Sequence, residues 1–416
     1  NFSGGEYDAI HKMMSPITIT NGGDVVVSNN IVSNNYTSKN PLYMNGAYAD
    51  KRYRFGSNKE EFNLIGGGIG VLGCNTLEIS SNTIEGNELR LRTRWNEYKN
   101  WDRWIYPGMI TFGLHGDASI KNNIIRNNNF RFERDNNYDT YNSKVFAIGI
   151  SPMNQAGHHG DNMNCSDSPL AIDSNRIENN LVIESGSENV HYFGVGMSIP
   201  GYCDENNFIN IRSNTISGNR LERHGGGDTQ SYESVGVYIN SNNDSTYFYD
   251  NHIVGNVAET DFSYGYAGGY HGNVSVHNST ISQNQGWHVG GIQLFGGAEV
   301  EINRSTITLN TANDAEGVGA IKNPGNMVKN SIIVGNRVLH NGQIMEEEIG
   351  GIDAREYSSE FHYNNIYGNS GYDFYNHRQD DKDATYNWWN SRSEQILIND
   401  EIWDGIDDDG NTGLVT

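Results

Sequence analysis

The sequence has no apolar run long enough to span a bilayer, and its 416 residues include only three cysteines. Basic residues are also scarce, because 28 Lys and Arg stand against 51 Asp and Glu and give a net charge of −23. The acidic balance disfavours nonspecific binding to nucleic acid. No segment keeps a helical period, so we do not expect a helical solenoid.

One short pattern, apolar-x-x-Asn-x-apolar-x-x-Asn, recurs along the chain. Examples are VSNNIVSNN at 27–35, ISSNTIEGN at 79–87 and IRSNTISGN at 211–219. Serine replaces the first asparagine at Ser279, Ser305 and Ser331. The final asparagines are Asn35, Asn87, Asn128, Asn180, Asn219, Asn256, Asn284, Asn310, Asn336 and Asn369. Internal repetition on this scale determines the fold class.

The repeat unit predicts short strands separated by tight corners. Successive final asparagines lie 26 residues apart in the later copies, and apolar residues alternate with polar ones over short runs. Stacked units of this kind form a parallel β-helix with coils about 4.8 Å apart. We expect the asparagines to occupy left-handed corners and to hydrogen-bond from coil to coil.

A second strand precedes each asparagine segment. Aligned by apolar residues, these strands predict an outward column of Gly70, Gly149, Gly196, Gly236, Gln293, Gly319 and Asp353. Such a column predicts a smooth wall along which a flat ligand can lie, or strands packed beneath a covering loop.

The stretches GGGIGV…ISSNTIEGN and YNWWN…IWDGIDDDGNTGLV resemble right-handed parallel β-helix proteins of the pectin-lyase-like superfamily, in its carbohydrate-binding and sugar-hydrolase repeat branch. The resemblance covers about 17–390. Asn390 departs from the family's Asn-Trp-Trp-Gly ending, and the polygalacturonase catalytic motifs are absent as a set. The resemblance implies an all-β, single-stranded, right-handed parallel β-helix of about ten to eleven coils. We assign 1–390 to this domain and 391–416 to a closing segment with an acidic turn.

Long intervals between the early asparagines predict long loops on the N-terminal coils, where repeat scaffolds concentrate function. One such loop, RTRWNEYKNWDRWIYP, interleaves aromatic and basic residues. Its aromatic rings suit the apolar faces of sugars, although they equally suit packing against the solenoid. The candidate substrate-binding residues are Trp95, Tyr98, Trp101, Arg103 and Trp104.

Candidate catalytic groups are outward or loop side chains that could act as base, acid or carboxylate partner. A lyase would use a base such as His115 or Tyr238 with Arg355 against a uronate, and a hydrolase would use two carboxylates. Solvated polar side chains are the alternative interpretation. The candidates are His115, Asp117, His158, His159, Asp161, Tyr238, Asp353 and Arg355, with Asp228 as a further carboxylate.

Two other features have chemical interest. DGIDDDGNTG contains Asp404, Asp407 and Asp409, which fit either a partial calcium loop lacking its downstream Glu or a solvated cap turn. Cys165 and Cys203 lie one coil apart and are candidates for a disulfide, which would indicate an oxidising compartment. Cys74 is predicted to be a free buried thiol.

The sequence thus predicts a secreted or cell-surface protein that binds and cleaves an extended polysaccharide, as a lyase or a glycoside hydrolase. Noncatalytic alternatives are an adhesin or glycan-binding stalk and a phage-type tailspike. The expected partner is a polysaccharide or surface glycan, without nucleic acid or a membrane span, and calcium is the only cofactor suggested. NFSGGEYDAI does not resemble a signal sequence, and the following segment begins in mid-repeat, so we expect a mature protein or a piece of a longer one.

Overall fold

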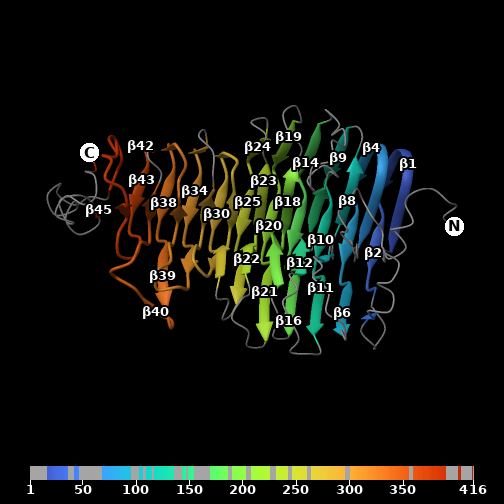
Figure 1. Cartoon of the computed structure of the whole chain (residues 1–416). Helices are drawn as coiled ribbons and strands as arrows, with labels where there is room; N and C mark the ends of the chain where they lie inside the picture. Colours follow the sequence, from blue (N-terminus) through green and yellow to red (C-terminus); the bar gives the residue numbers. More distant parts are fainter. Residues whose placement is uncertain are drawn as a thin grey trace, which may run out of the picture.

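Strand pairing in the structure is parallel almost throughout (Figure 1). The computed structural model describes residues 16–35, 42–45, 68–94, 103–105, 109–114, 117–134, 143–146, 149–153, 169–185, 190–202, 208–224, 231–241, 246–259, 264–295, 300–355, 359–389, 402–403 and 415. Within these ranges the regular elements are strands, and the one antiparallel strand pair joins β39 to β40. The chain is a parallel β-helix, as the sequence predicts.

Each coil contributes two strands, or one long strand, to the largest sheet, which we call sheet 1. Its 20 strands are β1 (Ile17–Ser28), β4 (Ile69–Ser80), β8 (Met109–Leu114), β9 (Ala118–Lys121), β13 (Ile150–Met153), β14 (Leu170–Asp173), β18 (Met197–Tyr202), β19 (Ile209–Arg212), β23 (Val237–Ser241), β24 (Thr246–Tyr249), β28 (Tyr270–Gly272), β29 (Val276–His277), β32 (Ile292–Leu294), β33 (Glu301–Asn303), β36 (Ile321–Lys322), β37 (Met327–Lys329), β41 (Ile352–Ala354), β42 (Glu360–His362), β44 (Phe374–Asn376) and β45 (Ile402–Trp403).

Sheet 2 follows sheet 1 around every coil, and its ten strands fit the predicted number of coils. They are β2 (Ile31–Ser33), β5 (Thr83–Glu85), β10 (Ile124–Arg126), β15 (Arg176–Glu178), β20 (Thr215–Ser217), β25 (His252–Val254), β30 (Thr280–Ser282), β34 (Thr306–Thr308), β38 (Ile332–Val334) and β43 (Asn365–Tyr367).

Sheet 3 comes next, and a shorter sheet 4 precedes the return to sheet 1. Sheet 3 contains β3 (Leu42–Asn45), β6 (Glu88–Arg94), β11 (Asn129–Arg134), β16 (Leu181–Ser185), β21 (Arg220–His224), β26 (Val257–Glu259), β31 (Gln285–Gly286), β35 (Thr311–Ala312), β39 (Arg337–His340) and β40 (Gln343–Ile344). Sheet 4 contains β7 (Arg103–Ile105), β12 (Ser143–Phe146), β17 (Val190–Phe193), β22 (Ser231–Ser234) and β27 (Tyr264–Ala267).

The repeated asparagines form two buried ladders, as predicted. Asn175 is typical: its Nδ2 donates to Ile120 O at 2.8 Å and to Asn214 Oδ1 at 3.0 Å. Its backbone N donates to the same Asn214 oxygen at 3.0 Å. Each side chain therefore satisfies backbone groups that the corner leaves without a ladder partner. At the serine positions the hydroxyl takes part of this role, since Ser279 Oγ accepts from Asn251 N at 3.1 Å.

The prediction that these asparagines adopt the left-handed backbone is wrong. The positive φ belongs to the residue just before each ladder position, as in Ser81 (φ 55), Asn122 (φ 55) and Leu309 (φ 57). The ladder asparagine has already turned inward, where its amide is buried between coils. The corner thus uses two residues, one for backbone geometry and one for hydrogen bonding.

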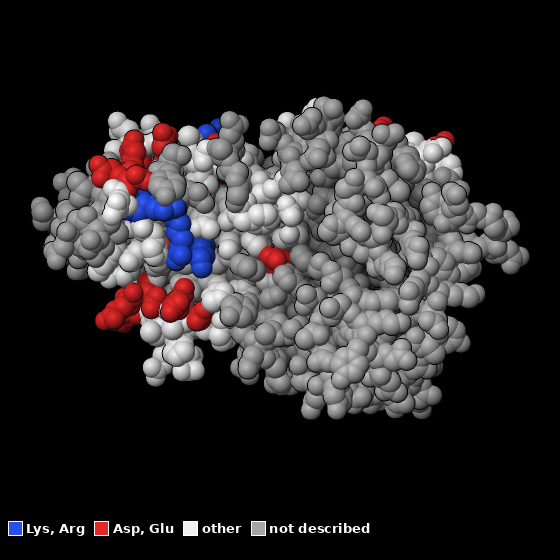
Figure 2. Space-filling model, viewed as in Figure 1, with Lys and Arg blue, Asp and Glu red and all other residues white. Residues whose placement is uncertain are grey.

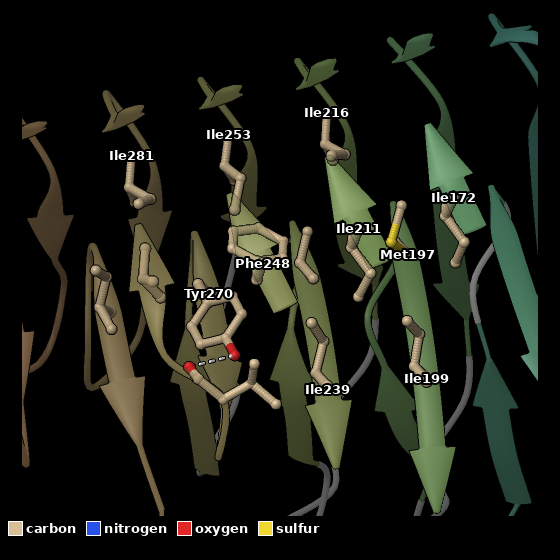
Figure 3. Close-up of a cluster of buried hydrophobic side chains, with 14 of the residues drawn as sticks. Ile172, Met197, Ile199, Ile211, Ile216, Ile239, Phe248, Ile253, Tyr270 and Ile281 are labelled. Atoms are coloured by element: carbon tan, nitrogen blue, oxygen red, sulfur yellow. Dashed lines mark hydrogen bonds between the residues drawn. The ribbon is translucent and has the colours of Figure 1, made fainter. Parts of the chain in front are cut away.

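Stacked aliphatic side chains fill the interior of the helix. Figure 3 shows Ile172, Ile211 and Phe248 in one column and Ile216, Ile253 and Ile281 in another, all 0% exposed. Full burial of such a side chain contributes about 1.5–3 kcal/mol. Alternation along each strand then directs the intervening side chains outward.

The predicted glycine column is also wrong in part. Gly149, Gly196 and Gly236 precede their strands at a buried corner, and a Cβ on Gly149 would lie 1.9 Å from Gly196 O. At Gly319 a Cβ would lie 2.5 Å from Gly350 O. Close approach of adjacent coils, and not ligand access, requires these glycines.

The last described residues extend the stack. Ile402 and Trp403 form β45, which pairs in parallel with β44, and Val415 bridges to Lys382. Cys74 is buried with its thiol free, as predicted, and desolvation raises its pKa. Among the described residues we find no helix of the length and apolarity needed to cross a membrane.

Candidate active site on the outer face

The outward side chains of the first strands of sheet 1 form one continuous column. Strand register links Ser198 to Tyr238, Tyr238 to His271, His271 to Gln293, Gln293 to Lys322, Lys322 to Asp353, Asp353 to Tyr375 and Tyr375 to Trp403. We call these eight residues the outer ladder. From Tyr238 to Trp403 the ladder has six intervals, which span about 29 Å.

A histidine and a glutamate meet at one end of the outer ladder. His271 Nδ1 lies 2.7 Å from Glu233 Oε2, and the two side chains are 5% and 13% exposed. The imidazole packs against Tyr238, at 5.8 Å between ring centroids, and Phe295, at 4.7 Å, two rings that also stack on each other. A carboxylate on one ring nitrogen orients the imidazole and stabilises the imidazolium that forms when the other ring nitrogen takes up a proton, which is the arrangement of an oriented general base.

Lys322 lies two rungs further along the ladder in an unusual electrostatic position. Burial lowers its pKa most, and the nearby Arg355 guanidinium lowers the pKa further. Asp353, Asp314 and Glu316 oppose both effects. A partly desolvated ammonium beside a second cation would be stabilised by an additional anion.

Asp353 anchors the next rung. It is 0% exposed, and it accepts from Arg355 Nε at 2.6 Å and contacts His377 Nδ1 at 2.7 Å. Arg378 Nε donates to Arg355 O at 2.6 Å, which fixes the arginine backbone from the following coil. The carboxylate therefore holds Arg355 and His377 in place over the ladder.

Acidic side chains border the cationic group. Figure 2 shows Lys and Arg side chains gathered toward the C-terminal end between two groups of Asp and Glu. His288 Nδ1 contacts Asp314, and this hydrogen bond is the main reason why the pKa of Asp314 is lowered. Burial, together with Glu316, Asp314 and Glu347, raises the pKa of Glu348.

Aromatic rings occupy the C-terminal end of the outer ladder. Tyr375 and Trp403 stack with an interplanar angle of 1° and centroids 5.7 Å apart. Tyr372 meets both rings edge-on, and His377 lies 4.6 Å from Tyr375. Aromatic side chains thus flank a polar and charged centre on both sides.

No family model, curated protein or solved structure matches this chain. The site must therefore be interpreted from its own residues. In the described part of the chain, no three or more His, Cys, Asp or Glu side chains are grouped so that they could hold a metal ion.

Three predicted catalytic residues share this region. Tyr238, Asp353 and Arg355 belong to the outer ladder or contact it directly. Asp117 is exposed and directly precedes β9. On its coil, the residue in register with the outer ladder is Ile110. That rung lies three coils from Tyr238, about 14 Å along the stack, so Asp117 is not brought to the site.

The other predicted site residues cannot be placed in the site. His115, His158, His159, Asp161, Asp228, Trp95, Tyr98, Trp101, Asp404, Asp407, Asp409, Cys165 and Cys203 lie outside the described residues. Arg103 and Trp104 belong to β7, where the backbone pairs with β12.

Sequence reasoning missed His271, Glu233, Lys322 and His377. His271 and Lys322 could have been found from the small residue that directly precedes their strands, which is Gly269 before Tyr270 and Ala320 before Ile321. Alignment on that position, instead of on the apolar residues, brings His271 and Lys322 into the ladder. Glu233 and His377 come from neighbouring segments and have no comparable periodic signal.

Proposed function

We propose that this chain is a carbohydrate-active β-helix protein of the pectin-lyase-like superfamily, from its carbohydrate-binding and sugar-hydrolase repeat branch. It binds an extended acidic polysaccharide along the outer ladder and cleaves it as a lyase. The observation that carries this proposal is the placement of two groups of titratable side chains, Glu233 with His271 and Lys322 with Asp353 and Arg355, on one face with a single rung, Gln293, between His271 and Lys322. A simple stalk would have its outward titratable groups scattered.

The shape of the ladder supports a long, narrow ligand. About 29 Å of regularly spaced side chains favours a polymer over a small metabolite. Phe295 at one end, backed by the buried Tyr238, and Tyr375 and Trp403 at the other are half-buried rings that can stack on sugars. Polar Gln293 and charged Lys322 lie between them.

Charge supports a uronate. The whole chain carries −23, so a polyanion needs a local cationic site, and Lys322 with Arg355 supplies one. Their mutual repulsion would be relieved by the carboxylate of the substrate. Arg355 is already oriented by Asp353, so little side-chain freedom is lost on binding.

The chemistry that fits these groups is β-elimination. Lys322 and Arg355 neutralise the uronate carboxylate, which acidifies the adjacent C–H. His271, oriented by Glu233, removes that proton, and the electron pair forms a carbon–carbon double bond while the bond to the glycosidic oxygen breaks. The leaving oxygen takes a proton from water. The products are a new reducing end and an unsaturated uronate.

A hydrolase needs two carboxylates that face the scissile bond. Here Asp353 is fully buried between Arg355 and His377, and Glu233 is 2.7 Å from His271. Because both carboxylates are already held by basic side chains of the protein, the site favours a lyase over a hydrolase. Because its polymeric substrate would be outside the cell, we also propose a secreted or cell-surface location.

The test is incubation of the purified protein with polygalacturonate, alginate, hyaluronan and neutral glucans, reading both new reducing ends and ultraviolet absorbance. Growth of both signals on a uronate polymer supports the lyase, reducing ends alone indicate a hydrolase, and neither signal leaves a noncatalytic glycan-binding protein. His271→Gln should lower the rate at least about 100-fold. Lys322→Met should raise KM. The control Lys329→Met, which removes a lysine paired with Glu301 at 2.7 Å, should change neither the rate nor KM.

A further inference from the structure

A second group of aromatic side chains lies at the corner between sheets 1 and 2 in two adjacent coils near the C-terminal end. Tyr363 and Tyr386 are 62% and 75% exposed. Their rings stack with centroids 5.4 Å apart and an interplanar angle of 10°. Two parallel tyrosine rings that remain this accessible provide a flat, amphipathic surface, which is the kind of surface that binds sugar rings.

The backbone at this corner does not favour tyrosine. Tyr363 and Tyr386 have φ values of 58° and 61°. At the corresponding corner of other coils the residues are Asn29, Ser81, Asn122, Ser174, Ser213, Asp250, Asn278, Arg304 and Asn330, most of them small polar residues. A bulky residue in the left-handed region is unfavourable, so two in successive coils indicate a role beyond the turn itself.

The neighbouring side chains indicate the chemistry of the ligand. Trp388, whose backbone bridges to Asn365 at the end of sheet 2, is 49% exposed and meets Tyr367 edge-on at 5.1 Å. The carboxylates of Glu360, on β42, and of Asp383, whose backbone bridges to Glu360, each lie 3.7 Å from His362 Nε2. Hydrogen bonds from Thr385 lower the pKa of Asp383 and keep it ionised. This corner therefore combines flat rings with hydrogen-bond acceptors and negative charge.

We propose that Tyr363 and Tyr386, with Trp388, form a binding site for neutral sugar rings. The rings stack on the C–H faces of the sugar, and the carboxylates accept hydrogen bonds from its hydroxyl groups. The same carboxylates repel uronates, so this site and the outer ladder select different glycans. The second strand of each coil separates the two sites, which makes the tyrosine site independent of the proposed lyase activity.

The sequence itself supplies matched variants. Tyr363→Asn and Tyr386→Asn introduce the residue that occupies this corner in other coils, so the fold should be kept or stabilised. Leu309→Asn is the control, because Leu309 is also exposed, at 54%, and also has a positive φ of 57°. Any effect of relieving the left-handed backbone should appear equally in the control.

The experiment is native electrophoresis of the full chain through gels that contain hydroxyethyl cellulose, galactomannan, starch or polygalacturonate. We expect at least one neutral polysaccharide to retard the wild type, and the Tyr363→Asn/Tyr386→Asn variant to bind it at least about tenfold more weakly. Leu309→Asn and Lys322→Met should bind neutral glycan like the wild type. The proposal is overturned if no neutral gel retards the wild type, if only polygalacturonate does, or if the double variant keeps its affinity.

Discussion

Removing one amide from the middle of an asparagine ladder should destabilise the whole stack. Asn214 is fully buried; its Nδ2 donates to Ile172 O at 2.9 Å, and its Oδ1 accepts from Asn175 N and Nδ2 at 3.0 Å. In Asn214→Ala, Asn175 N and Ile172 O both lose these bonds. At about 1–3 kcal/mol for each unsatisfied buried group, the expected loss is about 2–6 kcal/mol.

A serine at the same position should be less harmful. Ser279 shows why, since its hydroxyl accepts the backbone N–H of the previous coil in the same ladder. Asn214→Ser should therefore leave mainly Ile172 O without a partner and cost about 1–3 kcal/mol. Asn210→Ala is the control, because Asn210 is exposed on the same coil and its loss should change stability by less than about 0.5 kcal/mol.

The assay is urea unfolding followed by circular dichroism, with midpoints compared at a shared m-value. Hydrogen exchange adds a local measurement, because the amide of Asn175 should lose its protection first in Asn214→Ala. If Asn214→Ala unfolds at the same midpoint as the Asn210→Ala control, or later than Asn214→Ser, the ladder amides do not stabilise the fold as described.

Three further predictions follow from single positions. Gly196→Ala should destabilise the fold by more than 1 kcal/mol, because its Cβ would lie 2.4 Å from a side-chain carbon and 2.7 Å from a carbonyl oxygen. Gly23→Ala should not destabilise the fold, because its Cβ would have no atom within 4 Å. Equal urea midpoints for Gly196→Ala and Gly23→Ala would contradict the role of close packing at Gly196. Burial lowers the pKa of Lys322, so just below pH 10.5 the unfolded chain binds more protons than the folded chain. The free energy of unfolding of the wild type, compared with that of Lys322→Met, should therefore rise as the pH approaches 10.5. A difference that stays flat or falls would contradict the burial of Lys322. Cys74 should resist alkylation until the protein unfolds, since its thiol is buried with a raised pKa; rapid labelling of Cys74 in the native protein, mapped by mass spectrometry, would show otherwise.

The fold was predictable because its signal repeats. A buried asparagine such as Asn219 recurs beside apolar residues in every copy, so all the copies predict the same strand and corner. The number of coils follows from counting those copies. Local details were less accessible, because the left-handed residue and the ladder residue are adjacent and both are often asparagine, as in Asn122 and Asn123.

The site was only partly predictable. Tyr238, Asp353 and Arg355 were found from outward positions on strands whose register the sequence suggested. His271 was missed because its strand was left out of the apolar alignment, and Lys322 was missed because that alignment placed Gly319, three residues earlier, in the column. Only the close approach of neighbouring coils at the glycine corner fixes the true register.

The most direct test of the central claim asks where an acidic glycan binds. Hydroxyl-radical footprinting with mass spectrometry would compare the free protein with the protein saturated with galacturonate or alginate oligosaccharides. Binding along the outer ladder predicts protection of the half-buried Phe295, Tyr375 and Trp403, with no change at Tyr247, which is 45% exposed on the second strand of its coil. Protection confined to other faces, or none at saturating oligosaccharide, would contradict it.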